Sequence, residues 1–333
     1  MSESSVVLLK TATMFLVIVA GWATRRRGYI SAETTRDLGR FVVDVTFPAL
    51  GFTQMLRTVE MQTLRAEWYL LILVAAVFGI AGLVGFVIRP VFARGSQAPT
   101  FIFLVATMNW IYLPLPIVEE LFGDAGVRAV LLYNVGSQLV LWTLGVWVLQ
   151  GGHGKSRALR DLLRNPGLLA TVAGIAVALA FPAARAIAAP PAAGASLPLL
   201  CGSGVYQALA LIGGLTVPLS LLATGAQIGG LDLPRRRGPA RDLTGVIVGR
   251  LVAAPAVTVL LAHLAALAGV SIPDVPRLVG YLIACMPVAI SCSMFTERFG
   301  GDVSLGARAI VFTTLGSLLT MPAAFSLIRW LGW

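Results

Sequence analysis

Long stretches without a single charged residue are the feature that most constrains how this chain can fold. Eight such runs approach or exceed the length needed to cross a bilayer: 68–88, 95–118, 129–154, 166–184, 186–231, 251–273, 278–296 and 309–328. A membrane-spanning helix needs about 20 mainly apolar residues. Only 12% of the 333 residues are charged, whereas soluble domains carry roughly 25%. The composition excludes a cytosolic enzyme and a disordered tail, and it predicts an all-α polytopic membrane protein.

Two shorter runs raise the number of predicted transmembrane helices to ten. Segments 11–24 and 45–56 reach spanning length only when Lys10 and Asp44 are included. We count 186–231 as one span because prolines and glycines break its first third. The basic clusters on either side of 166–231 should also face the same side of the membrane, so an even number of crossings must separate them.

The charges of the loops predict the orientation of these spans. Loops on one side contain arginines 25–27, 36, 40, 89, 94, 164, 235–237, 241 and 298, with Lys155, Arg157 and Arg160; the other side has Arg57, Arg65, Arg185 and Arg277. Basic loops face the cytoplasm, so we expect a bacterial inner (cytoplasmic) membrane protein with both termini outside. The net charge of +10 sits in short clusters that suit an anionic lipid surface, and no nucleic-acid partner is expected.

Short matches between the two halves predict an internal repeat. The pairs are VTFP at 45–48 with LTVP at 215–218, ATMN at 106–109 with ACMP at 284–287, FGD at 122–124 with FGGD at 299–302, and GS at 136–137 with GS at 316–317. Five helices per half force the copies into opposite orientations, as in many secondary transporters. We predict a first repeat at 1–150, a cytoplasmic connecting loop at 151–165 and a second repeat at 166–333. Coincidence in a generic helical bundle is the alternative.

The fourth and ninth predicted helices carry helix breakers near their middles. Pro114 and Pro116 follow Asn109 in the fourth, and Pro287 lies in the ninth. Each proline removes a backbone donor, and broken backbone inside a bilayer is tolerated only where it is buried or lines a cavity. Two helices broken near the midplane would present positive amino-terminal ends there, which can hold an anionic group. The alternative is that the prolines only kink both helices for packing.

Polar and helix-breaking residues in and after these segments form the predicted substrate site. They are Asn109, Tyr112, Pro114, Asn134, Gln138, Pro287, Ser291 and Ser293. Asn134 and Gln138 are four residues apart and share a helix face. Asp44 is the clearest ionisable residue within a span, and we expect it to bind a coupling proton or cation, or to face the substrate. Two alternatives remain open for Asp44: it forms an ion pair with Lys10, or it lies near enough to the cytoplasmic end to reach water.

The sequence has no pattern of a metal or catalytic centre. His153, His263 and the three cysteines fit no metal-ligand or disulfide spacing, and no nucleophile–histidine–acid set is present. We therefore expect neither an enzyme nor a cofactor, with proton or sodium coupling left open.

Several segments taken together resemble a known family. They are RRRGYIS at 25–31, DVTFPAL at 44–50, LFGD at 121–124 with Tyr133-Asn134, RLVAAP at 250–255, Met286-Pro287 and FGGD at 299–302. These segments resemble the auxin efflux carrier family, whose bacterial members include proposed malonate and other organic-acid permeases. The resemblance implies a ten-helix inverted repeat related to bile acid–sodium symporters. Helices 1, 2, 6 and 7 would form a scaffold, and helices 3–5 and 8–10 a transport domain in which helices 4 and 9 cross.

By this likeness, Asn109 and the region of Pro287 would contact a substrate carboxylate. The chain departs from the family at Asp44, where bacterial relatives usually carry Asn, and at Asn109-Trp110, where a more glycine-rich stretch is typical. The short loop 151–165 also differs from the long central loop of plant members, so auxin itself is not implied.

The leading hypothesis is a secondary active transporter of small organic anions, such as mono- or dicarboxylates, that works by alternating access and exports its substrate. One alternative is a sodium-coupled bile-acid-type symporter, which is weakened because only Ser291 and Ser293 lie near the break of the ninth helix. The other is a membrane sensor that does not transport. The expected partners are the anion and the lipid bilayer, and a homodimer through the scaffold helices is left open.

Overall fold

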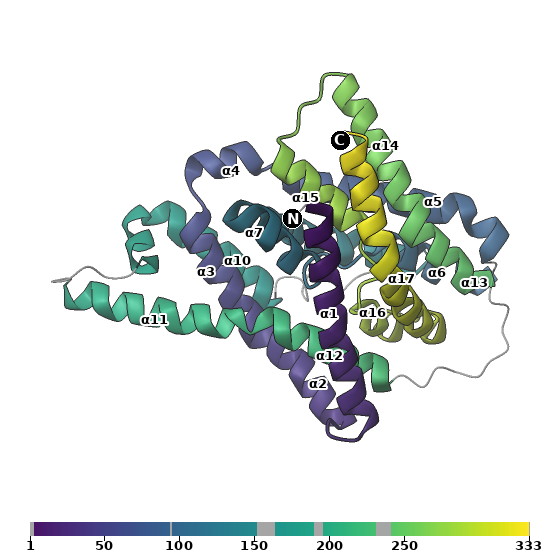
Figure 1. Cartoon of the computed structure of the whole chain (residues 1–333), viewed down its shortest axis with the longest axis horizontal. Helices are drawn as coiled ribbons and strands as arrows, with labels where there is room; N and C mark the ends of the chain where they lie inside the picture. The colour runs from purple at the N-terminus through teal and green to yellow at the C-terminus, as the bar shows by residue number, and fades with distance from the viewer. Residues whose placement is uncertain (1–2, 94, 152–163, 190–195, 231–240, 333) are drawn as a thin grey trace.

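The computed structural model describes residues 3–93, 95–151, 164–189, 196–230 and 241–332, and these segments are helical apart from their connections (Figure 1). Within them no strand forms beyond one isolated bridge. Most of the predicted connecting loop 151–165 and the basic cluster at 235–237 lie outside the described residues.

The first half contains the elements up to Leu149. They are α1 (Glu3–Arg26), α2 (Ala32–Phe41), η1 (Val42–Thr46), α3 (Phe47–Thr58), α4 (Met61–Glu67), α5 (Leu70–Phe92), η2 (Gly95–Gln97), α6 (Ala98–Ala106), α7 (Pro114–Val140), η3 (Leu141–Gly145) and α8 (Val146–Leu149). The Ser31 side chain accepts a hydrogen bond from the Thr34 amide and caps α2, a role in which Ser is strongly preferred. The π-helical turn η1 joins α2 to α3 without a loop.

The second half begins at Pro166. Its elements are α10 (Pro166–Ala180), η4 (Pro182–Ala188), α11 (Leu197–Gly214), α12 (Thr216–Gly230), α13 (Arg241–Val248), η5 (Gly249–Ala253), α14 (Ala254–Leu267), α15 (Asp274–Ala284), α16 (Cys292–Arg298) and α17 (Val303–Trp330). Asn165 caps α10 by accepting from the Leu168 amide, and Asp302 caps α17 by accepting from the Leu305 amide.

Five helical segments of the described chain are long and apolar enough to cross a membrane. They are Leu64–Phe92, Pro114–Leu149, Leu197–Gly230, Arg241–Leu267 and Val303–Trp330, and Pro166–Ala180 with Pro182–Ala188 adds a sixth if this pair, bent by 116°, is one span. The predicted ten-helix inverted repeat is therefore not confirmed. Two of the predicted spans are divided, because α6 has 9 residues and α16 has 7.

The helices pack in two groups. α1 lies along α12, and α3 lies against α10 and α11. In the second group, α5 packs on α6, α7, α13 and α14, and α17 packs on α13 and α16. In Figure 1, α10 and α11 lie on one side of the molecule and α13 and α14 on the other. The division of these groups into a scaffold and a transport domain stays a prediction.

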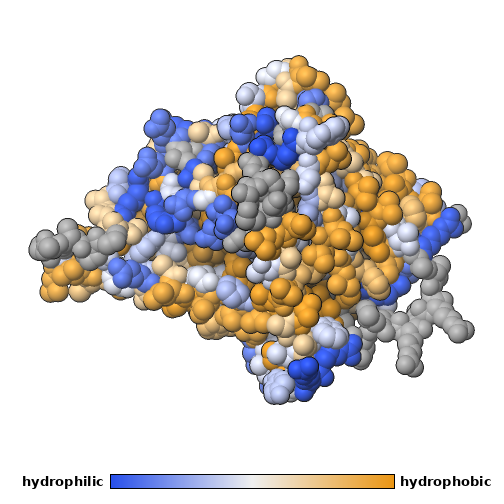
Figure 2. Space-filling model, viewed as in Figure 1, coloured by the Kyte–Doolittle hydropathy of each residue, from blue (hydrophilic) through white to orange (hydrophobic). Residues whose placement is uncertain are grey.

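Large apolar side chains cover much of the outer surface. Leu16, Leu211 and Leu319 are each at least 70% exposed, and Figure 2 shows hydrophobic residues over a wide part of the visible face. Soluble monomers rarely expose contiguous apolar patches beyond a few hundred Å². This surface is suited to lipid, as the charge-free runs predicted.

Two glycines allow α1 and α12 to touch through their backbones. A Cβ atom added at Gly21 would run into the carbonyl of Leu222, and one added at Gly225 would run into the carbonyl of Ile18. Small residues permit such close helix contacts in membranes.

We expect Gly225→Val to lower the melting temperature of the purified protein, because overpacking costs about 1–3 kcal/mol or more where backbone cannot yield. Gly79→Val is the matched control, since nothing lies within 4 Å of a Cβ atom added at Gly79. Equal melting temperatures for the two variants, measured in the same detergent, would contradict the close α1–α12 contact.

Candidate functional site

The fourth predicted helix is interrupted between α6 and α7. α6 ends at Ala106 and α7 begins at Pro114, so residues 107–113 are not α-helical. Pro114 and Pro116 lie in the first turn of α7, where the backbone N–H would have no intrahelical partner in any case. The prolines therefore begin a new helix and do not kink a continuous one.

The ninth predicted helix is interrupted in the same way, and the two interruptions pair with each other. α15 ends at Ala284 and α16 begins at Cys292. Met108 and Val288 form an antiparallel bridge. The Asn109 amide donates to the Pro287 carbonyl at 2.9 Å, and the Ala289 amide donates to the Thr107 carbonyl at 3.3 Å. We call the paired segments 107–113 and 285–291 the crossing.

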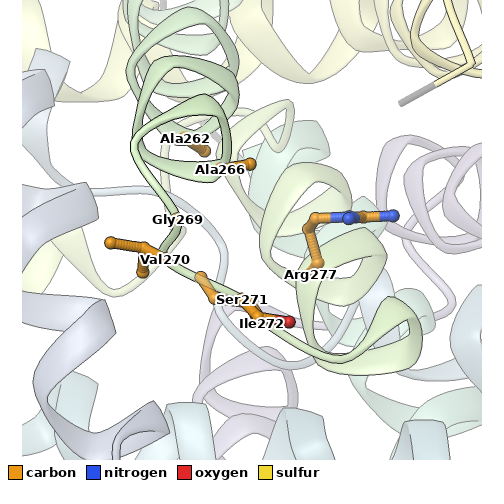
Figure 3. A pocket seen from close by; sticks show the side chains of 7 residues that line it. All are labelled: Ala262, Ala266, Gly269, Val270, Ser271, Ile272 and Arg277. Atoms are coloured by element: carbon orange, nitrogen blue, oxygen red, sulfur yellow. The ribbon is translucent and has the colours of Figure 1, made fainter.

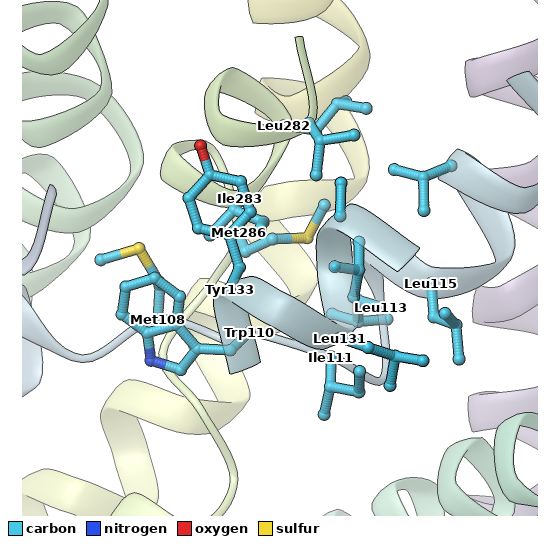
Figure 4. Close-up of a cluster of buried hydrophobic side chains, with 14 of the residues drawn as sticks. Met108, Trp110, Ile111, Leu113, Leu115, Leu131, Tyr133, Leu282, Ile283 and Met286 are labelled. Carbon is cyan, nitrogen blue, oxygen red and sulfur yellow. The ribbon is translucent and has the colours of Figure 1, made fainter. Parts of the chain in front are cut away.

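Apolar side chains bury one side of the crossing. Met108 and Met286 have no exposed surface, and in Figure 4 they lie among side chains from α7 and α15, including Tyr133 and Ile283. This packing excludes water from the paired backbone. It also fixes the position of both interruptions relative to α7.

Glycines turn the chain after each half-helix. Gly123 interrupts α7 with a φ of 54° and a ψ of −142°, and Gly300 follows α16 with a φ of 79°. Residues with a Cβ rarely adopt these conformations. The two Phe-Gly motifs that matched between the halves therefore mark equivalent turns.

A cavity of about 160 Å³ lies beside the crossing. We call it the crossing cavity; its lining residues are Val43, Phe47, Asn109, Trp110, Ile111, Tyr112, Asn134, Gln138, Leu141, Trp142, Asn165, Ala289, Ile290, Ser291 and Phe295. Five predicted site residues are among them: Asn109, Tyr112, Asn134, Gln138 and Ser291.

Side-chain amides form a chain along one wall of this cavity. Asn165 Nδ2 donates to Gln138 Oε1, and Gln138 Nε2 donates to Asn134 Oδ1, each at 3.5 Å. The sequence analysis missed Asn165. Its position before Pro166 is a recognisable capping signal, but its place in the cavity depends on how α10 packs against α7.

Asn109 holds the interrupted backbone with one end of its side chain. Its Oδ1 atom accepts hydrogen bonds from the amides of Ile111 at 3.3 Å and Tyr112 at 3.1 Å. These amides precede α7, and Pro114 and Pro116 contribute none. The amino-terminal end of α7 therefore has fewer amides for an anion than the sequence led us to expect. Both of these hydrogen bonds use Oδ1, so the donor end of the side chain, Nδ2, is the part that can serve a solute.

Trp110 adds a donor that sequence reasoning did not identify. Its side chain lines the crossing cavity and is 5% exposed. Among the described side chains, its buried Nε1 atom has no hydrogen-bond partner. A buried donor without a partner costs free energy, and an acceptor on a bound solute would satisfy it.

The remaining predicted site residues lie elsewhere. Pro114 begins α7 and Pro287 lies in the crossing, and neither lines the cavity. Asp44 lies in η1, is exposed and is also absent from the cavity wall. Its neighbours Val43 and Val45 are exposed as well, and the expected roles of Asp44 in coupling or in facing the substrate stay predictions. The side chains of Ser293 and Lys10 lie outside the described part of the structure.

Among the described residues, Arg250 is a charged side chain with no exposed surface, and the sequence analysis did not assign it to the site. Arg250 lies in η5. Its Nη1 atom donates to the Val105 carbonyl at 2.9 Å, and its Nη2 atom donates to the Ala284 carbonyl. These carbonyls belong to the last turns of α6 and α15, where the helix dipole is negative. One guanidinium thus joins the carboxyl ends of both half-helices.

Another hollow, of about 260 Å³, lies between the end of α14 and the start of α15 (Figure 3). Its one charged lining residue, Arg277, donates to Asp274 at 2.6 Å. This hollow is at the opposite end of α15 from the crossing and contains none of the predicted site residues.

We expect Arg250→Met to destabilise the protein strongly, since hydrogen bonds to charged groups are worth about 1.5–3 kcal/mol each and two carbonyls would lose their partner. The measurement is thermal unfolding in detergent. Arg241→Met is the matched control, because Arg241 is exposed at the start of α13. A melting temperature for Arg250→Met as high as that of the control would contradict the joining role of Arg250.

Comparison with known proteins agrees with this architecture. The chain matches the family model described as "Membrane transport protein" over residues 6–161 and again over residues 154–324. It is 24% identical over 317 residues to an uncharacterized transporter from Methanothermobacter thermautotrophicus, covering 93% of this chain and 94% of that protein. The chain therefore belongs to the membrane transport protein family, the family of the auxin efflux carriers, and is a multi-pass membrane transporter.

Proposed function

We propose that the protein is a secondary active carrier of a small organic anion, which binds in the crossing cavity. The observation that carries this proposal is a set of polar side chains gathered beside two interrupted helices. Interrupted helices at bilayer depth are typical of substrate sites in secondary transporters. The expected solute is a mono- or dicarboxylate, and the expected direction is efflux.

The size of the cavity supports a small solute. Its volume of about 160 Å³ is below the roughly 300–1,000 Å³ typical of sites for drug-sized ligands. A short carboxylate fits this volume, whereas a steroid-sized bile acid exceeds it. The structure therefore favours the organic-anion hypothesis over the bile-acid-type alternative.

The donors in the cavity are neutral. Asn109, Trp110 and Ser291 line it from the crossing, Asn134 and Gln138 line it from α7, and each of these side chains carries a neutral donor. Among the described residues, those that line the cavity include neither Arg nor Lys. Hydrogen bonds to a carboxylate are stronger than those between neutral groups, so neutral donors can hold it. The absence of a full ion pair in the wall also permits release, which a carrier requires.

The position of the cavity supports alternating access. Val43, Phe47 and Asn165 come from the group of α1, α3 and α10–α12, and the other lining residues come from the group that contains the crossing. Movement of one group along the other would carry the solute with the crossing. The Asn109–Pro287 pairing and the Arg250 bonds would keep both interruptions together during that movement.

The wall of the crossing cavity does not identify the coupling ion. It includes no carboxylate, and hard cations prefer oxygen ligands, particularly carboxylates. Asp44 remains our candidate for proton or cation coupling at a separate position. Asp44→Asn in transport assays with and without a proton or sodium gradient addresses that role.

We expect Gln138→Ala to reduce uptake of a radiolabelled dicarboxylate at low concentration by at least about tenfold, because one hydrogen bond to a charged group is worth about 1.5–3 kcal/mol. The assay uses purified protein in proteoliposomes, with malonate and succinate as probes. Gln207→Ala is the matched control, since Gln207 is exposed on α11 and outside the cavity.

Asn109→Ala should reduce uptake further, because Asn109 both donates to the solute and holds the backbone before α7. Wild-type rates for Gln138→Ala and Asn109→Ala would remove the site assignment. No flux of any mono- or dicarboxylate by the wild-type protein would remove the carrier proposal.

A further inference from the structure

A second cavity, of about 540 Å³, lies along the same side of α3 as the crossing cavity. Its walls are Leu50, Thr53, Gln54 and Arg57 of α3, Leu115, Glu119 and Val127 of α7, and Ala188, Tyr206, Ala210, Gly213, Gly214, Val217 and Pro218. The crossing cavity is near Asn165 and the basic residue Arg164, whereas this second cavity contains Arg57, which the loop charges place on the opposite side.

One face of the helix that contains η1 and α3 lines both cavities. Val43 and Phe47 belong to the crossing cavity, and Leu50, Gln54 and Arg57 belong to the second cavity. These five residues are spaced by four, three, four and three positions, which is the spacing of a single helical face. The two cavities therefore follow each other along one continuous stripe.

The segment that faces α3 also lines the crossing cavity first and the second cavity further along its sequence. Tyr112 lines the crossing cavity, and Leu115 and Glu119 line the second cavity. The rings of Phe47 and Tyr112 meet edge to face with centroids 6.3 Å apart, and further along Arg57 forms an ion pair with Asp124. The helix α3 and the segment 112–124 thus run side by side in the same direction.

Four apolar or aromatic side chains lie where the two cavities follow each other: Phe47 and Tyr112 line the crossing cavity, and Leu50 and Leu115 line the second cavity. We call Phe47, Leu50, Tyr112 and Leu115 the barrier layer. Glycines on neighbouring helices position it: a Cβ atom at Gly167 would collide with the Phe47 ring, and one at Gly213 would lie 2.8 Å from the Leu50 amide nitrogen. An anion cannot cross such a layer without losing its hydrogen bonds, which is costly in an apolar environment.

We propose that the two cavities are the two halves of one transport path, and that Phe47 is the residue that keeps them apart in this conformation by closing against Tyr112. This inference rests on the proposed carrier function, because a path is needed only if a solute crosses the membrane. The second cavity contains both Arg57 and Glu119, so it does not select an anion by net charge. Selection of a carboxylate belongs to the crossing cavity, and the second cavity is the water-filled exit.

The path is tested by reagent access to introduced cysteines, which requires no knowledge of the solute. Ser291→Cys reports on the crossing cavity and Gln54→Cys on the second cavity, both in a Cys201→Ser background because Cys201 is the exposed native cysteine among the described residues. A membrane-impermeant methanethiosulfonate is applied to right-side-out and inside-out vesicles. We expect Ser291→Cys to react from the side that carries Arg25 and Arg164, and Gln54→Cys to react from the opposite side.

Adding Phe47→Ala should open the barrier layer. We expect the rate at which the cysteine of Ser291→Cys reacts from the far side to rise at least tenfold. Phe41→Ala is the matched control, since Phe41 is an exposed aromatic residue on α2 outside both cavities, and it should leave both access patterns unchanged. If Phe47→Ala does not fold, Phe47→Val removes the ring while retaining an apolar side chain.

The path is overturned if Gln54→Cys and Ser291→Cys react from the same side, if Gln54→Cys reacts from neither side, or if no folded Phe47 variant changes access. Flux of dicarboxylates is measured separately in the same vesicles. If the two cysteines react from opposite sides but no dicarboxylate is transported, the carrier proposal alone is refuted. If dicarboxylates are transported but the Phe47 variants leave reagent access unchanged, only the role of Phe47 in the barrier layer is refuted.

Discussion

The structure depends on how backbone groups find hydrogen-bond partners inside a membrane. Lipid offers none, so an interrupted helix is stable only where protein supplies them. Here each interruption supplies partners for the other: the Asn109 amide binds the Pro287 carbonyl, and the Ala289 amide binds the Thr107 carbonyl. The Asn109 side chain satisfies two further amides. Breaking either helix alone would leave the other with unpaired groups, so the two interruptions are structurally interdependent.

Charge at the helix ends is balanced by one buried residue. The carboxyl ends of α6 and α15 converge, and their partial negative charges would repel each other in an apolar interior. Arg250 lies between them and hydrogen-bonds to both. Burying an arginine is costly without compensation, and two carbonyl partners with two dipole ends provide it. The same arrangement holds the Arg250 guanidinium at the ends of α6 and α15, and Arg250 does not line the crossing cavity.

The sequence predicted what local chemistry determines and missed what tertiary packing determines. Proline at 114 and 287 restricts the backbone wherever the chain goes, so the interruptions were predictable. Asn165 reaches the crossing cavity, and Arg250 reaches the ends of α6 and α15, only because distant helices pack together. The role of Asp44 stays a prediction, because loop charges indicate the approximate depth of a residue but not which way its helix face points. The ten-helix count is not confirmed, since the division of two predicted spans into short pieces leaves five or six segments that pass as single spans.

The pairing of the interrupted helices uses main-chain atoms, and this separates architecture from selectivity. Side chains at positions 110 and 291 touch the cavity without holding the bridge between Met108 and Val288. Substitutions at these positions can alter the shape and hydrogen-bonding capacity of the crossing cavity while the main-chain pairing of the crossing stays intact. Redesign of the proposed binding site can therefore begin at these two positions without rebuilding the fold.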